Sequence, residues 1–188
     1  MSRGLPPVTL ILGGARSGKS RYGEALAESR PGPCIYVATA HAGDDEMAAR
    51  IARHRARRGA RWTTVEEPVN LVAALRTHAV ADHVVVVDCL TLWLSNVLAA
   101  GCDPAAESER LVAVLPELRA PVIFISNEVG QGIVPDNALA RRFVDCAGCL
   151  HQDLAAAADA VVLMTAGLSL ALKGALPDRA SEPEGPPS

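Results

Sequence analysis

Short apolar runs alternate along the chain with longer amphipathic segments, and this pattern predicts the order of its secondary-structure elements. The runs are rich in Val and Ile, lack polar alternation and end at turn residues, as strands do when both faces of a parallel sheet are covered. Most of the segments between them have helical spacing, which favours an alternating β/α chain with right-handed crossovers. The predicted strands are 8–12, 34–39, 83–89, 122–126 and 160–165, with a short extra strand at 62–66, and the predicted helices are 18–30, 44–58, 68–79, 91–100, 104–119 and 137–158.

Prolines refine the predicted helix boundaries. Asp103 and Pro104 supply an N-cap and a proline at the first helical position, where its missing N–H has no cost. Pro135 and Asp136 predict a stop followed by a second N-cap. Pro116 lies inside the fifth predicted helix and should kink or end it, because proline cannot donate the helical hydrogen bond.

Length and composition predict one domain. The chain has 188 residues and is 49% hydrophobic, which suffices for one well-packed α/β domain and is too short for two comfortable ones. We expect this single domain to cover residues 1–176. Residues 177–188 are rich in Pro, Gly and Glu without apolar anchors, which predicts a disordered C-terminal tail.

Net charge and cysteine content limit the classes of binding partner and the cellular compartment that we expect. The net charge is −3, so the chain has no overall basic field for nucleic acid. No signal peptide and no apolar run of membrane-spanning length is visible, and five scattered cysteines fit reduced thiols better than a disulfide framework. Cys146 and Cys149 have the spacing of a zinc-ligand pair, but no stretch offers a second pair. We therefore expect a cytoplasmic protein without a membrane span, a nucleic-acid partner or a zinc site.

The segment 13–20 provides the most specific motif. It follows the first predicted strand and leads into the first predicted helix, the context that a phosphate-binding loop requires. The spacing G-x-x-x-x-G-K-S lets backbone N–H groups and a helix N-terminus face a polyphosphate, while Lys19 reaches its outer phosphates and the Ser20 hydroxyl binds Mg²⁺. The chain has only two lysines, and one stands at the required position, which disfavours a plain flexible turn. The predicted nucleotide-binding residues of the loop are Gly13, Gly14, Ala15, Arg16, Ser17, Gly18, Lys19 and Ser20.

A carboxylate, Asp88, ends the predicted strand that begins at His83. It follows four consecutive valines. Because ligands in open α/β sheets bind at the carboxyl ends of strands, we assign Asp88, with Ser20, to a Mg²⁺ site. The alternative is an aspartate that caps the following helix.

Arginines are concentrated between Arg50 and Arg61, where six of the 18 Lys and Arg residues fall. The acids at 44–46 and the bases that follow complement the macrodipole of the predicted helix, which explains part of the pattern. Their density also suggests a second anion or triphosphate contact. His54 shares a helical face with Ile51. It is either a core histidine or, as a neutral imidazole among arginines, a nucleophile toward a phosphate.

The Gly-rich polar loop 127–135 follows the predicted strand 122–126 at the same edge of the sheet. It is either a plain connection or part of an acceptor pocket. The sequence leaves both interpretations open.

Taken together, these motifs resemble the bifunctional adenosylcobinamide kinase / adenosylcobinamide-phosphate guanylyltransferase family of cobalamin biosynthesis. The resemblance runs from about Leu10 to Thr165. A phosphate loop alone is generic, but the combination is specific. The segments that carry it are 13–20, Tyr-Val-Ala-Thr at 36–39, Asp-Asp-Glu-Met-Ala-Ala-Arg-Ile at 44–51 with His54, Asn-Glu-Val-Gly-Gln-Gly-Ile-Val-Pro at 127–135, and Ala-Ala-Ala-Ala-Asp at 155–159.

The resemblance implies an α/β fold of the P-loop NTPase (RecA-like) type, with a mostly parallel sheet, helices on both faces and assembly as a homotrimer. It also implies two reactions that use nucleotide with Mg²⁺. One transfers a phosphoryl group from ATP or GTP to the aminopropanol hydroxyl of adenosylcobinamide, with Lys19 at the phosphates. The other transfers GMP from GTP to adenosylcobinamide phosphate through a guanylylated His54, with loss of pyrophosphate. The nucleotide contacts implied beyond the loop are Ala38, Thr39, Ala40, Arg55, Ala56, Arg57, Arg58, Glu66 and Asp88.

The chain departs from the family pattern at three positions. Arg53 stands where a histidine often precedes the nucleophile, and Asp88 stands where a glutamate is common. His151 replaces an asparagine before Gln152.

Two alternative functions use the same loop. A single-activity small-metabolite kinase would need the loop and Asp88 but no histidine among arginines. A non-enzymatic, nucleotide-dependent switch is disfavoured because the chain has no Asn/Thr-Lys-x-Asp motif for reading guanine. Trapping a covalent nucleotidyl-enzyme would separate the bifunctional enzyme from both.

Overall fold

Strands and helices alternate along residues 4–40 and 58–175, the part of the chain that this computed structural model describes. The strands are β1 (Val8–Gly13), β2 (Cys34–Ala38), β3 (Trp62–Glu66), β4 (Val84–Asp88), β5 (Val122–Ile125), β6 (Ala160–Thr165) and β7 (Leu168–Lys173). The helices are α1 (Lys19–Glu28), α3 (Leu71–His78), α4 (Leu90–Ala99), α5 (Pro104–Val114) and α6 (Ala138–Ala157), with a 3₁₀ turn at Leu115–Glu117.

These strands form one sheet in the order β3-β2-β4-β5-β1-β6-β7. Neighbouring strands are parallel except for the antiparallel pair β6 and β7. The carboxyl ends of β3, β2 and β4 are in register, so Glu66, Ala38 and Asp88 form one row across the sheet. β5 separates the strand that leads into the phosphate loop from the strand that ends in Asp88.

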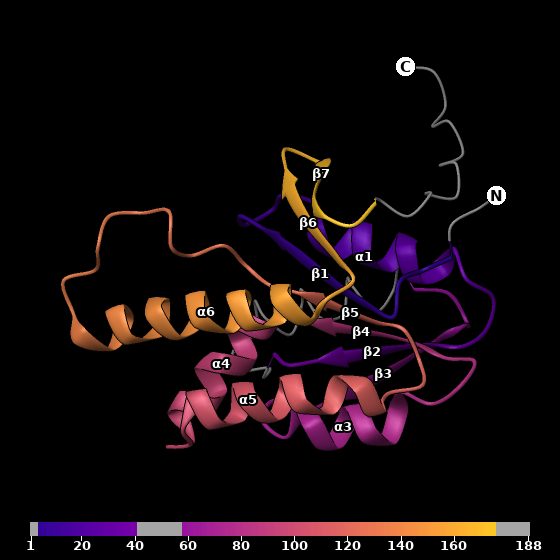
Figure 1. Ribbon diagram of the computed structural model, residues 1–188, viewed down its shortest axis with the longest axis horizontal. Coiled ribbons are helices and arrows are strands. Elements are labelled where there is room, and N and C mark those ends of the chain that lie inside the picture. Colours follow the sequence, from indigo (N-terminus) through magenta and orange to yellow (C-terminus); the bar gives the residue numbers. More distant parts are fainter. Residues whose placement is uncertain (1–3, 41–57, 176–188) are drawn as a thin grey trace.

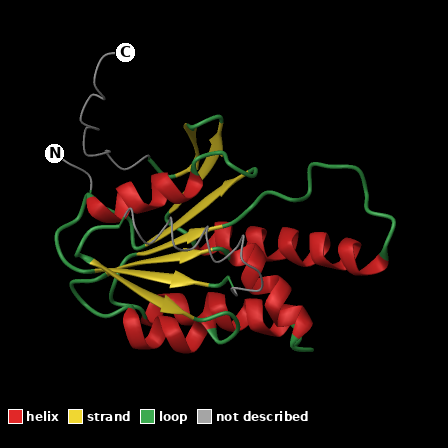
Figure 2. Ribbon diagram, turned by 180° about the vertical axis from the view of Figure 1, so that it is seen from behind, coloured by secondary structure: helices red, strands yellow, loops and turns green. Residues whose placement is uncertain are grey.

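Helices cover both faces of the sheet. α1 lies on one face, and α3, α4, α5 and α6 lie on the other, as two opposite views show (Figures 1 and 2). Side chains of successive strand residues point to opposite faces. In β4, Val84 and Val86 belong to the core on the α1 side, whereas Val85 and Val87 belong to the core beneath α3 to α6. The same alternation directs Asp88 toward the α1 face.

The predicted fold class, an α/β P-loop fold with a mostly parallel sheet and helices on both faces, is confirmed. Each predicted strand is present with ends shifted by at most two residues, and the extra strand 62–66 is β3 at the sheet edge. The helix predicted at 44–58 and the tail predicted at 177–188 lie outside the described residues, apart from residue 58. The single domain over 1–176 stays a prediction.

The start and end of α5 follow the proline and aspartate signals. Asp103 caps the helix, because its Oδ1 accepts the Ala105 N–H at 3.1 Å. The helix ends at Val114, and Pro116 falls in the 3₁₀ turn that follows. The prediction that Pro116 kinks or ends the helix is confirmed.

The predicted cap of the last helix is wrong by one residue. Asn137, rather than Asp136, is the N-cap of α6, and its Oδ1 accepts the Ala140 N–H at 2.7 Å. Asparagine and aspartate cap helices about equally well, so two adjacent candidates could not be ranked from the sequence.

Strand β7 is a feature that the sequence did not predict. The chain reverses after β6 through Ala166 and Gly167, whose φ values are 50° and 80°, as a two-residue hairpin turn with positive φ requires. Leu168, Leu170 and Leu172 then alternate along β7 and are 73%, 59% and 55% exposed. Leucine has no strong strand preference, so this edge strand gave a weak signal.

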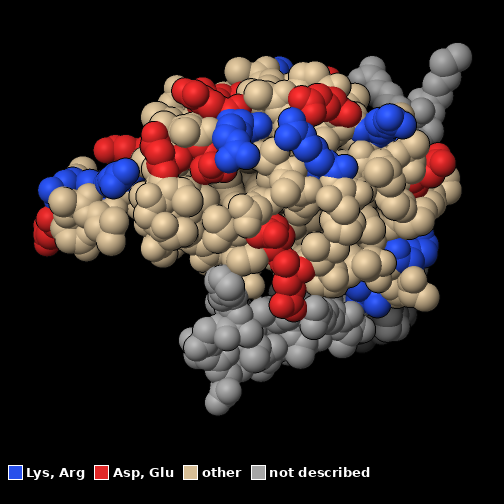
Figure 3. Space-filling model, turned by 90° about the horizontal axis from the view of Figure 1, so that it is seen from below, with Lys and Arg blue, Asp and Glu red and all other residues tan. Residues whose placement is uncertain are grey.

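The face that carries α3 and α5 has a mixed charge. Acidic and basic side chains are interspersed on it (Figure 3), and Arg76–Glu117 and Arg110–Glu107 form ion pairs there. Such exposed pairs contribute little to stability. Among the described helices, none has the length and apolar character to cross a membrane.

Candidate active site

The connection between β1 and α1 turns sharply against β6. A Cβ at Gly13, where φ is +152°, would lie 2.4 Å from the Met164 carbonyl oxygen and 2.8 Å from Ser17 Oγ. Gly18, where φ is +98°, is the N-cap of α1. Side chains of L-residues rarely adopt these conformations. The two glycines of the motif are therefore required by the backbone itself.

Backbone hydrogen bonds fix the loop to its neighbours. The Gly167 N–H donates to the Ser17 carbonyl at 3.1 Å, which joins the loop to the β6–β7 turn. The Glu128 N–H donates to the Gly13 carbonyl at 2.9 Å, which joins it to the segment after β5. Within the loop, the Ser17 N–H donates to the Gly14 carbonyl at 3.3 Å.

Lys19 begins α1 and turns its ammonium back over the loop. Its Nζ donates to the Gly14 carbonyl at 2.6 Å and lies 3.5 Å from Ser17 Oγ. The residue is 7% exposed, and this burial lowers the pKa of Lys19, while the negative charge of Asp88 opposes the shift. The ammonium thus lies where a polyphosphate on the loop would meet it.

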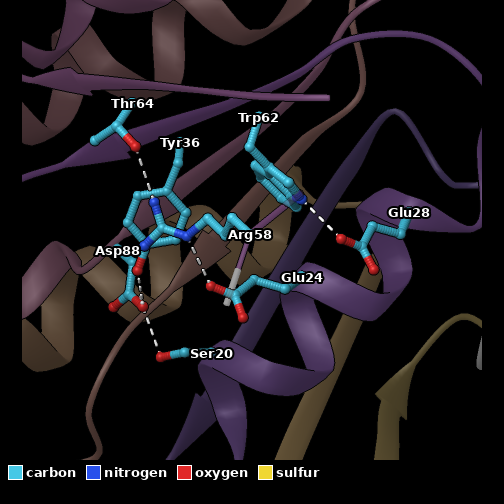
Figure 4. A network of polar contacts seen from close by, with 8 residues as sticks. All are labelled: Ser20, Glu24, Glu28, Tyr36, Arg58, Trp62, Thr64 and Asp88. Carbon is cyan, nitrogen blue, oxygen red and sulfur yellow. Dashed lines mark hydrogen bonds and ion pairs between the residues drawn. The ribbon is translucent and has the colours of Figure 1, made fainter. Parts of the chain in front are cut away.

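Two hydroxyl groups converge on one carboxylate oxygen at the end of β4 (Figure 4). Ser20 Oγ and Tyr36 Oη each donate to Asp88 Oδ2 at 2.6 Å. Oδ1 has no hydrogen-bond partner among the described residues. The helix-capping alternative for Asp88 has no support here, because the N-cap of α4 is Cys89 and shows no side-chain cap bond.

The Ser20 hydroxyl and the Asp88 carboxylate are oxygen donors of the kind that Mg²⁺ prefers. The 2.6 Å bond between them shows that both groups can face a single ion. These two residues therefore fit the metal site predicted from the sequence.

Ala38 ends β2 and lies between Glu66 and Asp88 in the row across the sheet, and Thr39 and Ala40 follow it directly. The Thr39 side chain is buried and committed to the backbone of Cys89, because its Oγ1 accepts the Cys89 N–H at 2.8 Å and donates to the Cys89 carbonyl at 2.7 Å. Glu66 is exposed at the end of β3. The structure thus brings these predicted nucleotide contacts to the edge that carries the phosphate loop.

Arg58 lies flat over the Tyr36 ring, with 3.3 Å between its guanidinium carbon and the ring centroid. Its Nε donates to Glu24 Oε1 and its Nη1 to Thr64 Oγ1, both at 3.0 Å. The side chain is only 5% exposed, and these contacts hold it beside the Asp88 site. His54, Arg55, Ala56 and Arg57 lie outside the described residues.

The loop 127–135 starts at the candidate site and then leaves it. Asn127 Nδ2 donates to Thr91 Oγ1 at 2.9 Å, near the start of α4. Further along, the chain runs outward before it returns to α6 (Figure 1), and Ile133 is 98% exposed. Both interpretations of this loop remain open.

A buried histidine of α6 lies on the face of the sheet opposite to α1. His151 of α6 is 8% exposed, and its Nε2 lies 2.7 Å from Ser126 Oγ. Burial lowers the pKa of His151, and the charge of Glu128 opposes the shift. The imidazole therefore favours its neutral form, which can share a proton with the serine hydroxyl.

Reasoning from the sequence missed the roles of Tyr36 and Glu24 in this site. Tyr36 belongs to the segment 36–39 that supports the family resemblance, but its hydroxyl had no assigned task. The sequence signal that could have found Tyr36 is strand alternation, which places Tyr36 on the same face of β2 as the predicted nucleotide contact Ala38. Pairing Ala38 with Asp88 requires the strand register, which the sequence does not contain.

Comparisons with known proteins show the family to which the chain belongs. The family model of cobinamide kinase / cobinamide phosphate guanyltransferase matches residues 9–172. The bifunctional adenosylcobalamin biosynthesis protein CobP of Pseudomonas aeruginosa is 52% identical over 168 residues, covering 88% of this chain and 96% of that protein. The bifunctional adenosylcobalamin biosynthesis protein CobU of Salmonella typhimurium is 41% identical over 179 residues, covering 87% and 98%.

A solved structure from Pyrococcus horikoshii OT3 has the same fold, with a TM-score of 0.52 and 9% identity, covering 90% of this chain and 87% of that one. At this identity the likeness concerns the fold alone.

Proposed function

The chain belongs to the cobinamide kinase / cobinamide phosphate guanyltransferase family, and we propose how its own residues serve that family's two reactions. It is a transferase of cobalamin biosynthesis, with cobinamide kinase and cobinamide phosphate guanylyltransferase activities. The observation that carries the proposal for the site is the hydrogen bond from Ser20, the last residue of the phosphate loop, to Asp88.

One loop binds the triphosphate in both reactions. The backbone N–H groups of the loop and the N-terminus of α1 face the phosphates, and the Lys19 ammonium balances their charge. The proposed nucleotide contacts are Gly13, Gly14, Ala15, Arg16, Ser17, Gly18, Lys19, Ser20, Ala38, Thr39, Ala40, Arg55, Ala56, Arg57, Arg58, Glu66 and Asp88.

Mg²⁺ accompanies the nucleotide, held by Ser20 and Asp88. When bound, it neutralises charge that develops on the phosphates. In the kinase step, the aminopropanol hydroxyl of adenosylcobinamide attacks the γ-phosphorus of ATP or GTP, and the bond from that phosphorus to the nucleoside diphosphate breaks. The hydroxyl proton leaves to solvent or to a nearby base.

Guanylyl transfer proceeds through His54. A neutral imidazole nitrogen attacks the α-phosphorus of GTP, the bond to the β-phosphate oxygen breaks, and pyrophosphate leaves. The phosphate of adenosylcobinamide phosphate then attacks the same phosphorus, and the phosphorus–nitrogen bond breaks to regenerate the imidazole. The covalent intermediate divides one displacement of phosphate by phosphate into two steps. Pyrophosphate leaves in the first step and the imidazole in the second, and both are good leaving groups.

Assembly and location complete the proposal. We place the enzyme in the cytoplasm as a homotrimer. The exposed leucines of edge strand β7 support burial against another copy of the chain, because long apolar sheet edges are seldom left open. All five cysteines are free thiols, which fits a reducing compartment.

Labelled GTP tests the covalent step. After incubation and denaturation, label from the α-phosphate should stay on the protein and label from the γ-phosphate should not. The adduct should be labile in acid and stable in base, as a phosphoramidate is and an ester to serine is not. Failure to retain α-label would favour a single-activity kinase.

A further inference from the structure

The Tyr36 hydroxyl contacts the Asp88 carboxylate in the candidate site, and this contact has no role in the proposed reactions so far. The hydroxyl donates to Oδ2 at 2.6 Å, a length typical of a strong bond from a hydroxyl to a carboxylate. As the donor of this bond, the phenol restrains one oxygen of the carboxylate.

Tyr36 is itself held in place by a second layer of contacts (Figure 4). The Arg58 guanidinium stacks on its ring at 3.3 Å, and the Trp62 ring meets it edge-on with 6.2 Å between centroids. Arg58 is fixed in turn by Glu24 from α1 and Thr64 from β3. Apart from Arg58, which precedes β3, these residues come from α1, β2 and β3, so the network connects three elements around the end of β4.

We propose that Tyr36 is a positioning residue for Asp88, and that Arg58 locks Tyr36 in the orientation that this requires. Both hydroxyl bonds of the carboxylate go to Oδ2, which leaves Oδ1 without a hydrogen-bond partner among the described residues. A carboxylate held only by Ser20 would lose one of two restraints on its rotation. This inference rests on the proposed metal role of Asp88, and it gives buried Arg58 a task besides a direct phosphate contact.

The alternative is that Tyr36 only satisfies its hydroxyl within the core. A merely structural tyrosine and a positioning tyrosine both affect stability when altered. Only a positioning tyrosine changes how strongly Mg²⁺ improves nucleotide binding, because outer-shell partners of a ligand carboxylate tune metal affinity.

The experiment measures binding of a fluorescent GTP analogue with saturating Mg²⁺ and with EDTA, for the full chain. The readout is the ratio of the two dissociation constants, with folding checked by thermal unfolding. Tyr36→Phe keeps the ring under Arg58 and removes the hydroxyl. We expect the ratio to fall about 10-fold while the affinity in EDTA changes by less than about 2-fold.

Two further variants, Trp62→Phe and Glu24→Gln, make the result decisive. Trp62→Phe keeps an aromatic ring beside Tyr36 and removes only the bond from Trp62 Nε1 to Glu28 Oε1 at 2.7 Å, so it should keep the wild-type ratio. Glu24→Gln loosens Arg58 without altering Tyr36, and should lower the ratio in the same direction by a smaller factor. It also provides the test if Tyr36→Phe does not fold.

The outcomes separate the possible failures. A wild-type ratio in Tyr36→Phe, or in Glu24→Gln if Tyr36→Phe does not fold, overturns the positioning role. A wild-type ratio in Asp88→Asn removes the metal role itself and the inference with it. A fall in Trp62→Phe equal to that in Tyr36→Phe would show a general loss of packing and also overturn the proposal.

Discussion

The Ser20 hydroxyl donates a 2.6 Å hydrogen bond to Asp88 Oδ2, although 68 positions of sequence separate the two residues. β5 lies between the strands that lead to them. Helix α1 makes the contact possible because it lies over the sheet, where it contacts both β5 and β4. Ser20, in its first turn, thereby reaches the end of β4.

Asp88→Asn should raise the Mg²⁺ requirement more than it weakens metal-free nucleotide binding, since the amide keeps the shape but loses the charge that attracts the ion. We expect the half-saturating Mg²⁺ concentration for either reaction to rise about 10-fold or more. Asp136→Asn is a control, because this exposed residue caps no helix. An unchanged Mg²⁺ titration in Asp88→Asn would rule out the metal role.

Lys19→Ala should impair both reactions, because a single loop is proposed to hold the triphosphate in each. The loss in kcat/KM should be about 10²-fold or more, as for other charge-stabilising groups. Lys173→Ala is the matched control, since this lysine donates to the Ala155 and Ala156 carbonyls at the end of α6. If either activity of Lys19→Ala stayed near wild type, the two reactions would not share the loop.

Gly13→Ala should destabilise the protein, whereas Gly14→Ala should not. The new Cβ at Gly13 would lie 2.4 Å from the Met164 carbonyl oxygen, while a Cβ at Gly14 meets nothing within 4 Å. We expect Gly13→Ala to cost about 2 kcal/mol or more and Gly14→Ala to stay within about 0.5 kcal/mol. Urea unfolding measures both, and equal effects would contradict the proposed close packing of the loop on β6.

His151 should make stability depend on pH. Its native pKa is lowered by burial, so the unfolded chain, with a histidine pKa of about 6.5, binds more protons. The free energy of unfolding should therefore fall as pH drops through about 6.5 and level off below the lowered native pKa. His151→Asn should remove this part of the pH dependence. Urea unfolding from about pH 7 to about pH 5 measures it, and an identical slope in both proteins would exclude the assignment.

Much of the fold could be predicted because its signals are local. The four valines before Asp88 form a strand buried on both faces, and the glycines at 13 and 18 mark a loop whose positive φ angles strain any other residue there. Strand β7 was not predicted, because its leucines are exposed at the edge of the sheet and do not form the continuous apolar run that marks the buried strands.

The site residues that could be predicted are those with a local sequence signal of their own. Lys19 and Ser20 are in the loop motif, and Asp88 ends an obvious strand. The contacts of Tyr36 and Arg58 depend on strand register and on the crossing of α1 over the sheet. These are tertiary properties that periodicity and spacing do not contain.

Mass spectrometry of the protein after incubation with GTP tests the central claim most directly. Peptide mapping should place one GMP on His54. His54→Asn should form no adduct and should lose guanylyl transfer, yet keep much of its kinase activity, whose acceptor hydroxyl attacks the γ-phosphate directly. GMP on any other residue, or an adduct that persists in His54→Asn, would contradict the account.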